Sequence, residues 1–151
     1  MDKALDYPVG LYGRAQFAQL YYLSGLARQK AGNAAGAAEY FRKAVEETER
    51  GNGADRQYDY YVGLAWKELG NTAEAENIFR NLTASANEGN VINGQFGGRV
   101  SDKARRAQDE TAAGFGYLGL GDKAKAAEHL KKALEYNSGN IWAKKMLETI
   151  K

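Results

Sequence analysis

The chain contains no cysteine and only one histidine and one proline among its 151 residues. Without cysteine there is no disulfide framework, no thiolate nucleophile and no cysteine-ligated metal. The single histidine, His129, excludes a metal site built from several histidines and gives no basis for a histidine-containing catalytic triad. We therefore expect no catalytic residues, no metal and no cofactor.

A strong excess of charge and a long apolar run are also missing. The 21 basic and 19 acidic residues give a net charge of +2, which is too balanced to indicate a nucleic-acid partner. The apolar runs are only a few residues long, so we expect no membrane insertion. The first residues lack the apolar segment of a signal peptide. Together with the lack of cysteine, this favours the cytoplasm.

Helix-forming residues are abundant, and their apolar spacing predicts helices almost throughout the chain. Each of three Gly-Asn or Gly-Asp pairs, beginning at Gly32, Gly70 and Gly121, separates two of these helices. Glycine there suits the left-handed end of the first helix, and Asn or Asp suits the N-cap of the second. The helices are predicted over about 14–30, 34–50, 55–69, 72–86, 101–120, 122–136 and 141–151.

The three hairpins align when their cap glycines are superposed. A small residue recurs before each turn at Gly25, Gly63 and Gly114, and other small and large apolar residues recur after it. Small residues at a helix crossing, with an aromatic ring or leucine beside them, are typical of closely packed antiparallel helices. The positions after the turn are Ala37, Ala75 and Ala126, then Phe41, Phe79 and Leu130, then Ala44, Leu82 and Ala133.

This pattern resembles the tetratricopeptide repeat, a helix-turn-helix of about 34 residues. Two features depart from the family pattern. The family's tryptophan position holds Tyr21, Asp59 and Glu110, and its closing proline is absent. The resemblance implies an all-α, right-handed superhelical stack of three such hairpins plus a C-terminal capping helix. We expect one domain over 1–151, with repeats at about 14–50, 54–86 and 101–137, a capping helix at about 140–150 and an inserted loop at 87–100.

Residues 4–7 repeat the pattern found at 133–136, the end of the last hairpin. The chain would then open on the tail of a preceding repeat and form the C-terminal piece of a longer protein. Short motifs near residues 4–8, 63–70 and 116–121 resemble the C-terminal repeats of large bacterial proteins. Those proteins carry an upstream domain of unknown function that is connected with carbohydrates.

Two further motifs suggest chemistry but have a structural explanation. Residues 114–119 match the dinucleotide fingerprint G-x-G-x-x-G, yet they lie inside a predicted helix instead of between a strand and a helix. The repeat explains Gly114, and for Gly116 and Gly119 we expect contact with the inserted loop. Glu110 and its acidic neighbour are expected at the solvated surface, with His129 as a partly exposed structural residue.

The resemblance also implies a concave groove lined by the first helix of each hairpin. Tyrosine rings and amide tips suit adaptable recognition of a peptide backbone or a sugar. An equally weighted alternative is that these residues merely cover a narrow groove. Within the insertion, Phe96 or Arg99 could lie beside a ligand if the loop folds back. The positions expected in the groove are Gln19, Tyr22, Leu26, Gln29, Gln57, Tyr60, Tyr61, Leu64, Lys67, Gln108, Thr111 and Phe115.

We expect a non-catalytic scaffolding module that binds a peptide segment or a partner protein in this groove. The Lys, Arg and Asn set that clamps a peptide carboxylate in chaperone-binding relatives is missing, so docking of a chaperone tail is not expected. An alternative is an accessory region of a carbohydrate-active protein that contacts a glycan or its own upstream domain. Self-association through the N-terminal end is a third hypothesis.

Overall fold

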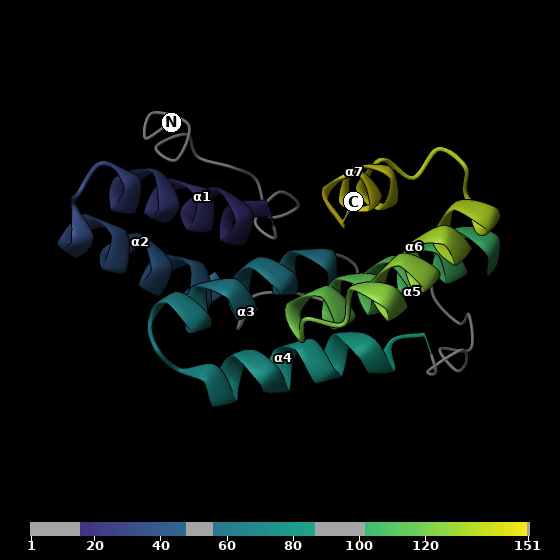
Figure 1. The fold of residues 1–151 in the computed structure, drawn as a ribbon, viewed down its shortest axis with the longest axis horizontal. Helices are drawn as coiled ribbons and strands as arrows, with labels where there is room; N and C mark the ends of the chain where they lie inside the picture. Colours follow the sequence, from purple (N-terminus) through teal and green to yellow (C-terminus); the bar gives the residue numbers. More distant parts are fainter. Residues whose placement is uncertain (1–15, 48–55, 87–101, 151) are drawn as a thin grey trace, which may run out of the picture. The chain divides into compact units, whose positions relative to one another are not determined.

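The computed structural model describes residues 16–47, 56–86 and 102–150 (Figure 1). All regular structure within these residues is helical, which confirms the predicted all-α class. Residues 1–15, residues 48–55 and the predicted insertion at 87–100 lie outside the described residues. The helices are α1 (Gln16–Lys30), α2 (Ala34–Glu46), the 3-10 helix η3 (Arg56–Tyr58), α3 (Asp59–Glu68), α4 (Thr72–Ala84), α5 (Asp102–Gly119), α6 (Lys123–Tyr136) and α7 (Ile141–Ile150).

The three turns have the same backbone conformation. Gly32, Gly70 and Gly121 have φ angles of 78°, 81° and 88°, in the left-handed region that favours glycine. After each glycine, the next amide donates back to a carbonyl in the preceding helix, as Asn33 N does to Arg28 O at 2.9 Å. The predicted glycine caps are therefore confirmed, because each hydrogen bond satisfies a carbonyl that the helix end would leave unpaired.

The residue after each of these glycines starts the next helix. The side-chain oxygen of Asn33 accepts from Gly36 N at 2.9 Å, and that of Asp122 accepts from Lys125 N at 3.0 Å. Asn71 accepts in the same way at the start of α4. These contacts confirm the predicted N-caps, since each oxygen takes one of the amides that has no partner within its helix.

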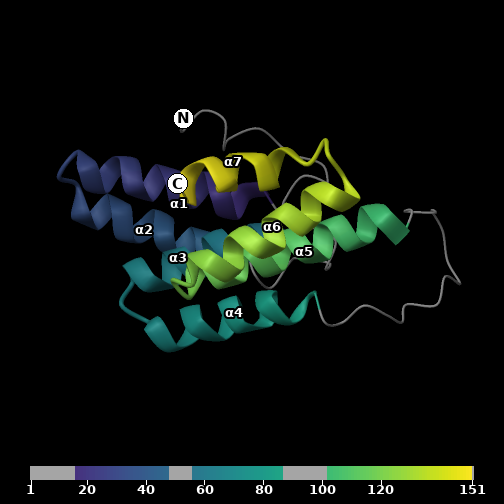
Figure 2. The same cartoon turned by 45° about the vertical axis from the view of Figure 1, so that its right-hand side comes forward.

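Small residues allow close packing inside the first and last hairpins, where α1 lies beside α2 and α5 beside α6 (Figure 2). A Cβ atom added at Gly25 would lie 2.5 Å from Cε1 of Phe41, and one added at Gly114 would lie 2.7 Å from Cγ of Leu130. Both distances are far below van der Waals contact. The aligned pairs Gly25–Phe41 and Gly114–Leu130 are thus physical contacts that bring the two helices of each hairpin together.

The chain divides into two compact units, one ending at Ile78 and the other beginning at Phe79, within α4. In the first unit α1 and α2 contact each other and both contact α3. In the second unit α5 and α6 form a hairpin, and α7 packs against α6. The superhelical stacking of the hairpins and the single domain over 1–151 stay predictions from the sequence.

In the second unit, α5 lies directly against the end of α4. A Cβ at Gly116 would lie 2.6 Å from the carbonyl oxygen of Phe79 and 2.7 Å from the amide nitrogen of Thr83. A Cβ at Gly119 would overlap the ring of Phe79. Residues of α4 thus fill the space beside these two glycines, while the inserted loop that we expected there lies outside the described residues. The two glycines let α5 approach the backbone of α4, which also leaves no role for the dinucleotide fingerprint.

Candidate functional site

Several residues predicted for the groove come together between α1 and α3 in the first unit. Nε2 of Gln19 donates to the hydroxyl of Tyr61 at 3.1 Å and so links the two helices. The ring of Tyr22 lies 6.0 Å from that of Tyr61 and 5.8 Å from that of Phe41, centroid to centroid. Tyr60 and Tyr61 meet edge to face at 5.4 Å. The three tyrosines thus form one connected group.

Most of each tyrosine ring in this group is buried. Tyr22 and Tyr60 are 9% exposed and Tyr61 is 7% exposed. Burial raises the pKa of both Tyr22 and Tyr60 to about 12, and it also raises the pKa of Tyr61. Their hydroxyls are consequently neutral near pH 7 and can both donate and accept hydrogen bonds.

At the other end of the same face, Nε2 of Gln29 donates to Oε2 of Glu68 at 3.0 Å. Both side chains are exposed. Glu68 is not among the residues predicted for the groove, because the repeat register points to its neighbour Lys67. An exposed amide such as Gln29 can also pair with water, so no local pattern in the sequence points to Glu68. We call the surface formed by Gln19, Tyr22, Gln29, Tyr60, Tyr61 and Glu68 the α1–α3 polar strip.

The remaining predicted residues of the first unit border this strip. Gln57 lies in η3 and is half-buried, and Lys67 is exposed near the end of α3. Leu26 and Leu64 are half-buried on α1 and α3. No hydrogen bond of the described residues joins Gln57 to the tyrosines, so the amides of the aligned glutamines do not act alike.

The third hairpin does not reproduce the strip. Phe115 has no exposed surface, and its ring meets that of Trp142 on α7 at 6.1 Å. The Thr111 hydroxyl donates to Ala107 O at 2.6 Å and accepts from Nδ2 of Asn140 at 2.7 Å. Buried Phe115 is therefore a core residue and leaves the candidate set. Gln108 is exposed on α5, and Phe96 and Arg99 lie outside the described residues.

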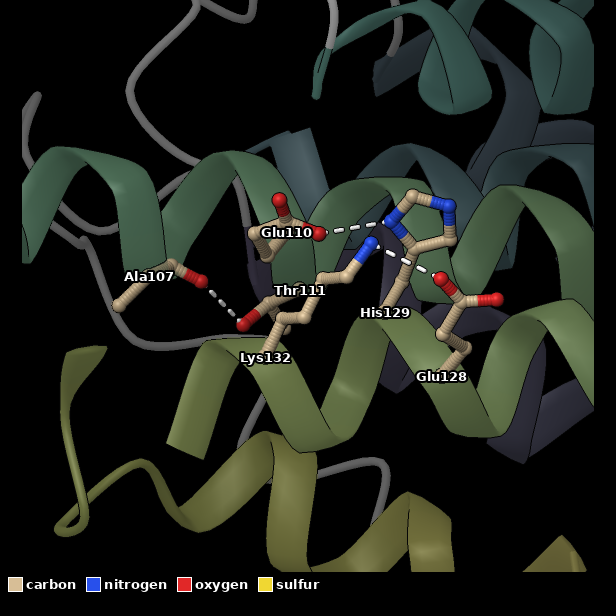
Figure 3. Close-up of polar contacts among 6 residues, drawn as sticks. All are labelled: Ala107, Glu110, Thr111, Glu128, His129 and Lys132. Carbon is tan, nitrogen blue, oxygen red and sulfur yellow. Dashed lines mark hydrogen bonds and ion pairs between the residues drawn. The ribbon is translucent and has the colours of Figure 1, made fainter. Parts of the chain in front are cut away.

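A second polar cluster joins α5 to α6 (Figure 3). Nδ1 of His129 lies 2.7 Å from Oε2 of Glu110, and both side chains are largely covered, at 17% and 16% exposure. The imidazole also stacks on Tyr117, with 5.0 Å between the ring centroids. Glu110 is thus not a solvated surface carboxylate as expected, because the histidine of the facing helix holds it.

The equivalent positions of the first hairpin show what this cluster does. Tyr40 corresponds to His129, and its ring contacts Tyr21 at 6.1 Å and the Arg28 guanidinium at 3.9 Å. On the outer side of each cluster an exposed Glu–Lys pair recurs, Glu39 with Lys43 and Glu128 with Lys132. In the first hairpin two tyrosines, Tyr21 and Tyr40, stand at the positions of Glu110 and His129. The His129 cluster is therefore best explained as packing between two helices.

The described residues also bear on metal binding and membrane insertion. Among the described residues, no group of three His, Asp or Glu side chains is placed to hold a metal ion. Every helix in those residues is too short or too polar to cross a bilayer.

A comparison of the sequence with protein families identifies two segments of the chain. The tetratricopeptide repeat model matches residues 18–49 and 114–140, which include the α1–α2 and α5–α6 turns. These two segments are tetratricopeptide repeats. Repeats of this family generally mediate protein–protein interaction, on extended surfaces formed by neighbouring helices. The expected repeat at 54–86 stays a prediction.

The NMR structure of the first TPR domain of the human RPAP3 protein aligns over 90% of this chain and 91% of that chain, with 16% identity and a TM-score of 0.36. The comparison with curated protein sequences gives no significant match.

Proposed function

We propose that this tetratricopeptide protein is a non-catalytic binding module that takes an extended segment of a partner protein on the α1–α3 polar strip. The observation that carries this function is the grouping of Gln19, Tyr22, Tyr60 and Tyr61 on two neighbouring helices. Amide and hydroxyl groups at such a surface can pair with the backbone of an extended peptide, and the covered rings keep them in place.

The Tyr22 hydroxyl is the strongest single contact point of the strip. It has no hydrogen-bond partner within the described part of the chain. It is not one of the buried oxygens that lack a partner, so the Tyr22 hydroxyl reaches solvent. A hydroxyl fixed by a buried ring loses little conformational entropy when it binds, which makes it a suitable anchor for a partner.

The burial of the tyrosine rings also favours a peptide over a sugar as the ligand of this surface. Sugar binding by aromatic residues needs an accessible ring face, whereas these tyrosines pack on one another and on Phe41 with less than a tenth of each exposed. The accessory role in a carbohydrate-active protein therefore gains no support from this surface.

The test removes polar atoms from the strip while keeping its packing. Short linear peptides are selected from a random display library on the wild-type protein, and their Kd values are measured by fluorescence anisotropy. The double variant Tyr22→Phe, Gln19→Met should weaken binding about tenfold, as loss of two hydrogen bonds predicts. Alanine is unsuitable at Tyr22, because it would open a cavity beside Phe41.

The matched control is Tyr117→Phe, which removes a tyrosine hydroxyl from the second unit. It should leave the Kd unchanged. Circular dichroism should give similar helix content for all three proteins, and thermal unfolding should give similar midpoint temperatures. Selected peptides that bind the double variant as tightly as the wild type would contradict the proposed function, and so would a selection that enriches no peptide.

A further inference from the structure

We propose that the segment bound on the α1–α3 polar strip carries a basic side chain, arginine or lysine, which pairs with Glu68. This inference rests on the proposed function and adds the chemistry of the partner. It follows from the groups that α1 and α3 place side by side, because these offer hydrogen-bond acceptors around one carboxylate.

The geometry places the carboxylate within reach of the tyrosine group. Glu68 and Tyr61 are seven residues apart on α3, which is about two helical turns and about 10 Å along the axis. The same spacing separates Gln29 from Tyr22 on α1. On α3, Glu68, which accepts from Gln29 at 3.0 Å, therefore lies two turns from Tyr61, which accepts from Gln19 at 3.1 Å. About three residues of an extended peptide span this distance.

The charge that acts on the exposed hydroxyl is negative. After burial, the causes that raise the pKa of Tyr22 are the Glu68 carboxylate and Tyr61. Lys67 precedes Glu68 in the sequence, but adjacent residues of a helix do not face the same side. A cation placed between the Tyr22 hydroxyl and Glu68 would therefore be stabilised there.

The polar atoms of this end also match a basic group better than an acidic one. Glu68 offers two carboxylate oxygens, of which the Gln29 amide occupies one in the structure. The Tyr22 hydroxyl adds oxygen lone pairs. A guanidinium has five N–H donors and no acceptor, so it can pair with the Glu68 carboxylate while the Tyr22 hydroxyl, about two turns away, pairs with the peptide backbone. An acidic partner would meet like charge at Glu68, which disfavours it.

Selection from the same peptide library tests the proposal. Enriched peptides should share an arginine or lysine at one position. Replacing that arginine with citrulline, its neutral analogue, should weaken binding to the wild-type protein about tenfold, the effect of losing one charge-assisted hydrogen bond. With the Glu68→Gln variant, the Kd values of the arginine and citrulline peptides should differ by less than about twofold, because the carboxylate that pairs with the arginine is gone.

Glu148→Gln is the matched control. It removes one negative charge from an exposed position on α7, in the other unit, and should keep the full tenfold preference for arginine. Loss of the preference in both variants would show a general effect of net charge and would overturn the assignment to Glu68.

The remaining outcomes separate the two proposals. Peptides without a basic residue that are nevertheless weakened by Tyr22→Phe, Gln19→Met would leave the binding surface standing and overturn the basic partner. A preference for arginine that persists in Glu68→Gln would also overturn it. If the double variant weakens no enriched peptide, the proposed function fails and this inference fails with it.

Discussion

Glycine has two structural uses in the described residues, and they differ at the level of single atoms. Gly121 turns the chain with a φ of 88°, where nothing lies close to an added Cβ. Gly119 lies inside α5, and an added Cβ would overlap the Phe79 ring. The first use is readable from the sequence, because a turn glycine acts on its own neighbours. The second depends on a helix that lies elsewhere in the chain.

Substituting Gly119 by alanine should destabilise the second unit by about 1–3 kcal/mol, the usual range for overpacking a filled interface. The free energy of unfolding from denaturant titration is the measurement. Phe79→Leu in the same background should recover part of the loss, because the smaller side chain makes room for the methyl group. If the losses in the free energy of unfolding caused by Gly119→Ala and by Phe79→Leu simply add in the double variant, the contact between the two residues is contradicted.

At the scale of the helical hairpin, the interface between the two helices holds different kinds of side chain at equivalent positions. In the first hairpin Tyr40 packs between an aromatic ring and a guanidinium, whereas in the last His129 lies between a carboxylate and an aromatic ring. What stays constant are the two packed helices and their capped turn. The hairpin is thus specified by its turn and its small residues, and the interface between its two helices tolerates different side chains.

The caps of the turns should contribute measurably to stability. Asp122→Ala leaves the amide of Lys125 without its acceptor and should cost about 1 kcal/mol in the free energy of unfolding. Asp122→Asn should cost much less, because asparagine caps the corresponding helices at Asn33 and Asn71. Similar losses in both variants would instead point to the exposed ion pair between Asp122 and Lys125, 3.6 Å apart.

At the scale of the units, α7 determines which of the aligned repeat positions remain available to bind a partner. The aligned positions Tyr22 and Tyr60 belong to the polar strip, but Thr111 is bound by Asn140 at the start of α7. Trp142 covers Phe115 in the same way. Of the positions expected on one surface, Tyr22 and Tyr60 thus lie together in the first unit, whereas Thr111 and Phe115 contact residues 140 and 142 at the start of α7.

Asn140 should hold α7 in place through two hydrogen bonds. Its Oδ1 accepts from Ala143 N at 3.1 Å, and its Nδ2 donates to Thr111. Asn140→Ala should lower the free energy of unfolding by about 1–2 kcal/mol and speed amide exchange in α7 more than in α6. Asn137→Ala is the control, since the Asn137 side chain accepts only from the nearby exposed Gly139 amide among the described residues. Unchanged exchange in α7 would contradict this role.

The sequence by itself determined the helices, their turns and the small residues that pack within a hairpin. These features follow from local backbone preferences and from spacing along one helix, so residues such as Gly32, Asn33 and Gly25 reveal them. The tertiary structure decided the use of Gly116 and Gly119, the burial of Phe115 and the place of Glu68 beside Gln29. Each of these depends on which distant helix covers a surface, and no local pattern in the sequence carries that information.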